Sequence, residues 1–160
     1  MKNKNEFLTK ALHNLDVVGA IIMIVSLFLG NFYAGDPGGG YVYSISYPGY
    51  KLIFNSDYLL GTLFILIPAV ILIVGRIQSL KQYEGLLKFG LPIVTVIFLF
   101  VLKGQLADTG NAGGAASFAT GAWIYLVGNV LALIGGAAVF FKFDVEEKVN
   151  EFTKGKKDSK

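Results

Sequence analysis

The sequence contains no cysteine and a single histidine, so it lacks the side chains on which several kinds of chemistry depend. Without cysteine there is no disulfide, no thiolate metal site and no cysteine nucleophile. A single histidine argues against histidine-ligated haem and against a multi-histidine metal centre. We therefore expect no cofactor, no metal ion and no catalytic residue.

Charged residues are scarce inside the long apolar stretches of the chain. Hydrophobic residues make up 54% of the 160 positions and the mean hydropathy is +0.59, which is too apolar for an ordinary soluble domain. One stretch, Ser117 to Phe141, runs for 25 residues without a formal charge. About 20 helical residues cross the roughly 30 Å hydrocarbon layer of a bilayer, so this stretch predicts a transmembrane helix.

Three further apolar stretches lead to the same prediction. The fold class that follows is an all-α membrane protein, with four transmembrane helices in an antiparallel bundle over residues 17–142. The expected spans are residues 17–34, 58–75, 86–102 and 117–141, the outer loops are 35–57 and 103–116, and the tails are 1–16 and 143–160. Phe32, Tyr33 and Ala34 form a poor signal-cleavage site, so we expect the first span to be retained.

Lysine and arginine give this bundle an orientation. Of the 14 such residues, 12 lie in the N-terminal tail, the loop 76–88 and residues 142–160, whereas the opposite loops carry only Lys51 and Lys103. By the positive-inside rule, both termini are expected in the cytoplasm and the two outer loops outside the cell membrane. The placement of these charges beside apolar spans also argues against a nucleic-acid partner, although the formal net charge is +3.

The first outer loop has the pattern of a small β-hairpin. Residues 41–47 (YVYSISY) alternate bulky and small side chains, which is typical of a strand. Pro48 and Gly49 suit the centre of a type II turn, and residues 50–54 (YKLIF) suit a returning strand. The alternative is an irregular loop whose tyrosines lie at the level of the lipid headgroups.

Two features favour contacts with other proteins. Small residues fall on one side of the fourth span, where they would let another helix approach closely. These helix-packing residues are Ser117, Gly121, Gly128, Ala132 and Gly135. Tyrosine provides a large contact area at low entropic cost, and four tyrosines crowd the first outer loop. These outer-loop residues are Tyr41, Tyr43, Tyr47 and Tyr50.

Polar side chains at membrane depth are few. Asn129 lies at the centre of the fourth span, and Thr95 and Thr62 lie within the third and second. Such residues usually bond between helices or to their own backbone, although a polar pathway is the alternative. Lys88, near the start of the third span, is expected to snorkel to the headgroups.

The layout of four spans, with both ends inside, a longer first outer loop of strand character and a short second one, resembles the claudin-type tetraspan architecture. In that group the first outer loop carries a tryptophan and a disulfide-forming cysteine pair, and this loop has neither. The resemblance therefore implies a layout and assigns no functional residue.

The leading hypothesis is a non-enzymatic scaffold or accessory subunit, surrounded by membrane lipids, that binds another membrane protein or itself. The first alternative is a small oligomeric channel or transporter in which Asn129, Thr95 and Thr62 line a path. The second is an outward-facing lipid-modifying or protective protein that uses Asp36, Asp57 or Asp108.

Overall fold

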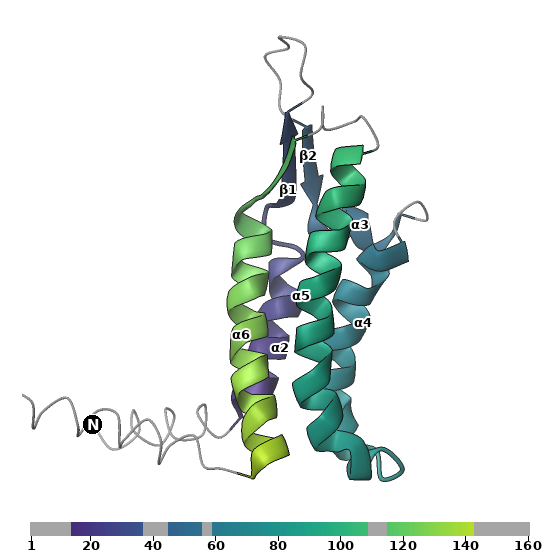
Figure 1. Cartoon of the computed structure of the whole chain (residues 1–160), viewed down its shortest axis with the longest axis vertical. Helices are drawn as coiled ribbons and strands as arrows, with labels where there is room; N and C mark the ends of the chain where they lie inside the picture. Colours follow the sequence, from purple (N-terminus) through teal and green to yellow (C-terminus); the bar gives the residue numbers. More distant parts are fainter. Residues whose placement is uncertain (1–13, 37–44, 56–58, 109–114, 143–160) are drawn as a thin grey trace, which may run out of the picture.

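Four apolar helices stand side by side and carry a small antiparallel sheet at one end (Figure 1). The computed structural model describes residues 14–36, 45–55, 59–108 and 115–142. The helices are α2 (Leu15–Ser26), α4 (Leu59–Ile73), α5 (Glu84–Asp108) and α6 (Thr120–Phe141). Helix α6 packs between α2 and α5, and α4 packs against α2 and α5. Successive helices run in opposite directions, so neighbours in this ring are antiparallel.

Three of these helical segments are long and apolar enough to cross a membrane. They cover residues Leu59–Arg76, Lys81–Ala107 and Thr120–Phe141. The first includes the short helix η1 (Val74–Arg76), and the second begins with the short helix η2 (Lys81–Tyr83). Helix α2 is also apolar but has only 12 residues. Among the described residues, the chain is therefore mostly helical, with three segments of membrane-spanning length and one shorter helix packed beside them.

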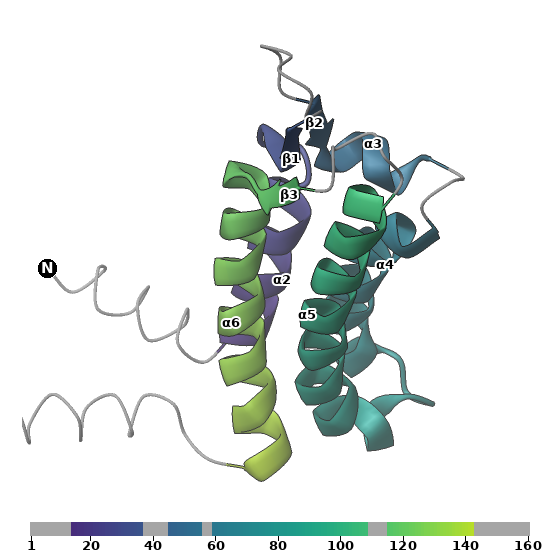
Figure 2. The same ribbon diagram turned by 45° about the horizontal axis from the view of Figure 1, so that its top comes forward.

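The sheet ties together two segments that are distant in the sequence. Strand β1 (Asn31–Asp36) lies between β2 (Ile45–Pro48) and β3 (Ala115–Phe118), and both pairings are antiparallel. Tyr33 in the central strand pairs with Tyr47 on one side and with Phe118 on the other. Figure 2 shows the sheet above the helices, with the start of α2 and the end of α6 at the opposite end of the bundle.

The first predicted helix ends earlier than the sequence indicates. Helix α2 stops at Ser26 instead of continuing to Ala34, and a turn over residues 27–30 leads into β1. Gly30 has a φ of +71°, a left-handed conformation that suits glycine and reverses the chain. Residues 32–34 are apolar because they belong to the central strand of a sheet that packs on the helix ends, and not because they continue a span.

The structure confirms a small antiparallel sheet at this end of the bundle, but the predicted hairpin of residues 41–47 and 50–54 is wrong. Its second strand, residues 50–54, is instead mostly the short helix α3 (Gly49–Ile53), and Pro48 is the residue before that helix. The loop's strand β2 pairs with β1, which precedes the predicted hairpin. Gly49 does not have the positive φ that the predicted type II turn requires, and a Cβ atom there would lie 2.6 Å from the carbonyl oxygen of Leu27. Gly49 therefore packs closely on the end of α2 and begins helix α3 instead of forming the predicted type II turn.

Aromatic rings fill the junction between the sheet and the helices. Phe32 of β1 packs edge-on against Tyr125 of α6 at 5.3 Å and contacts Phe64 of α4 at 5.7 Å between ring centroids. The Tyr33 hydroxyl donates to the carbonyl oxygen of Leu99 in α5 at 2.9 Å. All of these side chains are fully buried. Burial raises the pKa of Tyr33, so its hydroxyl remains protonated and acts as a donor.

Candidate functional site

The small residues of α6 pack against α2 of the same chain. The buried members of this stripe are Gly121, Gly128, Ala132 and Gly135. A Cβ atom added to Gly128 would lie 2.8 Å from the carbonyl oxygen of Gly19 in α2. One added to Gly135 would meet the backbone nitrogen of Asp16. Because the obstacles are backbone atoms, larger residues at Gly128 or Gly135 would force the two helices apart.

Ser117 does not belong to this stripe. It lies in β3, three positions before α6 begins at Thr120. Its hydroxyl donates to the carbonyl oxygen of Ala34 at 3.2 Å and is exposed. The prediction that placed Ser117 on a helical face is therefore wrong, because residues 115–118 are extended to pair with β1.

The polar residues predicted at membrane depth donate hydrogen bonds to backbone carbonyls of two segments, α3 and α5. Thr62 donates to Ile53 at 3.0 Å, and Thr95 donates to Leu91 in its own helix at 2.8 Å. Asn129, which is 1% exposed, donates from Nδ2 to the carbonyl oxygen of Pro92 in α5 at 3.1 Å. This arrangement favours a packing role for all three side chains over a shared polar pathway.

Replacing Asn129 by leucine is expected to cost about 0.6 kcal/mol of folding free energy, and not more than about 1.7, as for other interhelical hydrogen bonds in membrane proteins. Unfolding by sodium dodecyl sulfate (SDS) in mixed micelles, followed by circular dichroism, measures this change. The carbonyl of Pro92 keeps its place in α5, so the helix content should be unchanged. A loss several times larger would show that Asn129 does more than join α5 to α6.

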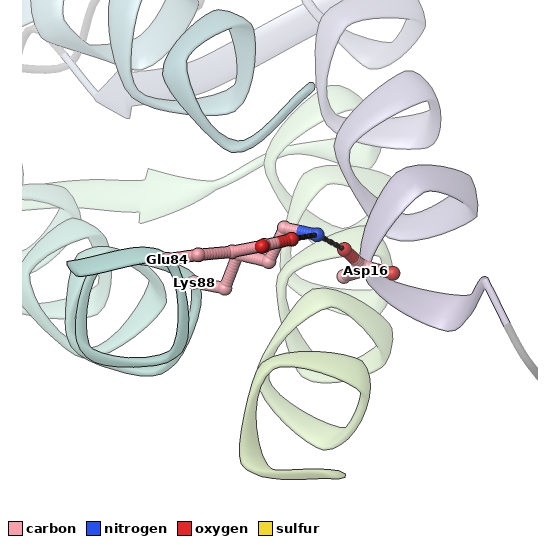
Figure 3. Close-up of polar contacts among 3 residues, drawn as sticks. All are labelled: Asp16, Glu84 and Lys88. Atoms are coloured by element: carbon pink, nitrogen blue, oxygen red, sulfur yellow. Dashed lines mark ion pairs between the residues drawn. The ribbon is translucent and has the colours of Figure 1, made fainter. Parts of the chain in front are cut away.

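A buried ion cluster joins α2 to α5 at the end of the bundle remote from the sheet (Figure 3). The ammonium group of Lys88 lies 2.7 Å from Oδ2 of Asp16 and 2.7 Å from Oε1 of Glu84. Lys88 is 9% exposed and Asp16 is 4% exposed. Burial of these charges is tolerable only because they are paired. Lys88 therefore does not snorkel outward, as its position near a span end predicts, but points into the bundle.

Part of this cluster is visible in the sequence. Glu84 and Lys88 are four residues apart, which places them on the same face of a helix. Asp16 stands at the last position of the predicted N-terminal tail and is in fact inside the first turn of α2. Its pairing with Lys88 depends on the approach of α2 to α5, which the spacing of residues along the chain does not show.

The predicted outer-loop surface is only partly described. Tyr41, Tyr43 and Asp57 lie outside the described residues. Tyr47 is partly buried in β2, and Tyr50 in α3 is 43% exposed. Asp36 ends β1 and Asp108 ends α5. Within the described part of the chain, no three or more His, Cys, Asp or Glu side chains are grouped so as to hold a metal ion.

One face of α5 carries glycines that no packing within the described part of the chain explains. A Cβ atom built at Gly90 or Gly104 would meet nothing within 4 Å. Between them lie Ile93, Ile97 and Phe100, which are 42%, 55% and 56% exposed. The spacing of three and four residues is that of a helix–helix seam. We call this set of five residues the α5 seam.

The ion cluster, the buried polar residues and the α5 seam are the features of this structure that bear on function. No protein-family model, curated protein or solved structure matches the chain. The proposals below therefore rest on the features of the chain itself.

Proposed function

We propose that this protein is an integral protein of the cell membrane that crosses the bilayer four times, with both termini in the cytoplasm and the sheet outside. Three helical segments have the length and composition of spans. Helix α2 and the turn after it run beside α6 from Gly135, next to Asp16, to Gly121, next to Asn31. Fourteen residue steps of α6 cover about 21 Å, which is most of the hydrocarbon layer.

The distribution of side chains supports this location. The interior of the bundle holds the small residues, the hydrogen-bonded residues and a hydrophobic core, and large apolar residues also cover its outer surface. Examples of the outward residues are Ile21 and Val25 of α2, Leu66 of α4, Ile97 and Val101 of α5, and Val127, Val130 and Ile134 of α6. In water such a surface would be an aggregation hazard, but in lipid it is the solvated face.

We further propose that the protein is a non-enzymatic scaffold or accessory subunit that binds a helix of another membrane protein, or a second copy of itself, through the α5 seam. The observation that carries this proposal is the open space around Gly90 and Gly104. A glycine inside a helix costs about 0.5–1 kcal/mol relative to alanine. In membranes that cost is offset when the glycine lets another backbone approach closely, and residues 14–36, 45–55, 59–108 and 115–142 supply no such backbone here.

Replacing Gly90 and Gly104 together by leucine is expected to abolish association and leave the fold intact. Among the described residues no atom lies within 4 Å of either added Cβ atom, so stability in SDS titration should not fall, and removal of the glycine cost should raise it by about 0.5–1 kcal/mol per position. Association should weaken at least about tenfold, which corresponds to about 1.4 kcal/mol. Affinity purification in mild detergent, followed by native mass measurement, reads both the partner and the copy number.

The matched control is Val130→Leu, which adds apolar bulk on the exposed face of α6. It should leave association unchanged. If the unaltered protein is recovered only as a lone monomer, the scaffold proposal fails. If the double glycine variant associates as the unaltered protein does, the α5 seam is not the contact.

A further inference from the structure

Phe118 of β3 is the centre of a small cluster at the sheet end of the bundle. The ring of Phe100 in α5 lies 5.2 Å from it, edge to face, and that of Trp123 in α6 lies 5.9 Å from it in the same manner. The ammonium group of Lys103 in α5 lies 5.1 Å from the centre of the Phe118 ring. These four residues, from three different elements, are the Phe118 cluster.

The cluster is accessible from outside the protein. Trp123 is 59% exposed and Phe100 is 56% exposed. Within residues 14–36, 45–55, 59–108 and 115–142, the ion pairs formed are those of Lys88, and no carboxylate pairs with Lys103. Lys103 is held by its contact with the Phe118 ring, which orients an ammonium group without neutralising it. A positive charge therefore remains available for a ligand.

The position of the cluster along the helices points to one class of ligand. Lys103 lies in the last turns of α5 and Trp123 in the first turn of α6, so both are near the level where the helices meet the sheet. In a membrane this is the headgroup level, where tryptophan places its ring in the interface and its N–H toward polar groups. The exposed side chain of Val127, four residues after Trp123 on the same side of α6, continues this surface toward the middle of the bundle.

We propose that the Phe118 cluster binds an anionic phospholipid. Its phosphate group would accept hydrogen bonds from the Lys103 ammonium group and the Trp123 indole. Its acyl chains would lie along the exposed apolar side of α6, formed by Trp123, Val127 and Ile134. A lipid fits this surface better than a soluble anion does. The cluster offers a single cation flanked by aromatic rings, and an exposed apolar surface on which acyl chains can pack lies beside it. The inference rests on the membrane location proposed above.

The chain contains one tryptophan, so Trp123 is a specific probe of its own surroundings. The full-length protein is reconstituted into phosphatidylcholine vesicles in which a fraction of the lipid is brominated phosphatidylglycerol or, in a parallel series, brominated phosphatidylcholine. Bromine quenches tryptophan fluorescence only on close contact, and the two series give the relative affinity of each lipid for the position beside Trp123. We expect phosphatidylglycerol to be preferred about fivefold, the contribution of one lysine at an anionic lipid surface.

Variants of the protein test whether the Phe118 cluster causes the preference for phosphatidylglycerol. Lys103→Gln is expected to bring the ratio of affinities close to one, and Lys103→Arg is expected to keep it. Lys51→Gln, which removes an exposed lysine from α3 at the same end of the bundle, is the matched control and should keep the preference. The emission maximum of Trp123 and the helix content show whether each variant is folded as the unaltered protein is.

The possible results distinguish a failure of the proposed lipid site from a failure of the proposed membrane location. Equal quenching by both lipids in the unaltered protein overturns the site and leaves the membrane location standing. A preference that survives Lys103→Gln, or that is lost in Lys51→Gln, also overturns it. Quenching by neither lipid contradicts the membrane location itself.

Discussion

Replacing Lys88 by methionine is expected to destabilise the protein by about 3–5 kcal/mol. The substitution keeps an apolar side chain of similar length but removes the only cation that pairs with Asp16 and Glu84 among the described residues. Breaking a buried ion pair by removing one partner leaves an uncompensated charge, and this is the origin of the large cost. The free energy of unfolding from SDS titration, with circular dichroism and Trp123 emission as probes, measures it.

A triple variant tests whether this loss comes from charge. Asp16→Asn and Glu84→Gln, added to Lys88→Met, remove every charge of the cluster, and replacement of a whole buried ion cluster is often neutral. Most of the lost stability should therefore return. Lys81→Met, at an exposed position in η2, is the matched control and should have almost no effect. A loss below about 1 kcal/mol for Lys88→Met would show that the cluster is not a buried one.

Replacing Gly128 by leucine is expected to cost at least about 3 kcal/mol, at the upper end of the usual penalty for overpacking. A Cβ atom at this position would lie 2.8 Å from the carbonyl oxygen of Gly19 and 2.9 Å from the backbone nitrogen of Met23. Backbone atoms cannot rotate away as a side chain can, so α2 and α6 would have to separate along their length. The same SDS titration measures the loss.

The sharpest control for Gly128→Leu is the same substitution at Gly104. Both residues are glycines inside long helices, but only Gly128 faces another backbone, whereas the space beside Gly104 is open. Gly104→Leu should therefore not lower stability, and removal of the glycine should raise it by about 0.5–1 kcal/mol. Equal losses at the two positions would mean that the cost reflects the helix in general and not the contact between α2 and α6.

Hydropathy predicts α4, α5 and α6 well and α2 poorly. A membrane span needs about 20 consecutive apolar residues, and a run of that length can be recognised directly in a sequence. Residues 32–34 are as apolar as a helix interior, but they form the central strand of a sheet. A short apolar run cannot be assigned to helix or strand by its composition alone. Strand β1 follows α2 and strand β3 precedes α6, so their pairing depends on how two distant parts of the chain meet in space. The local sequence does not show this contact.

The candidate sites were predictable to different degrees. The spacing of Gly121, Gly128, Ala132 and Gly135 is enough to place them on one face of a helix, but not to identify α2 as the segment they meet. The ion pair between Asp16 and Lys88 was missed because each residue, taken alone, is typical of a span end. Whether a glycine is packed or open, as Gly90 and Gly104 are, depends on the neighbours in space and has no signature in the sequence.

The most direct test of the four-span arrangement uses the absence of cysteine, since a single introduced cysteine is the only thiol in the chain. Three variants are labelled in intact cells with a membrane-impermeant maleimide: Asn5→Cys near the N-terminus, Ser79→Cys between η1 and η2, and Ser117→Cys in β3. We predict that Ser117→Cys is labelled in intact cells and that the other two react only after the cells are permeabilised. Labelling of both Asn5→Cys and Ser117→Cys from outside would show that α2 does not cross, and labelling of both Ser79→Cys and Ser117→Cys from outside would contradict the bundle as a transmembrane structure.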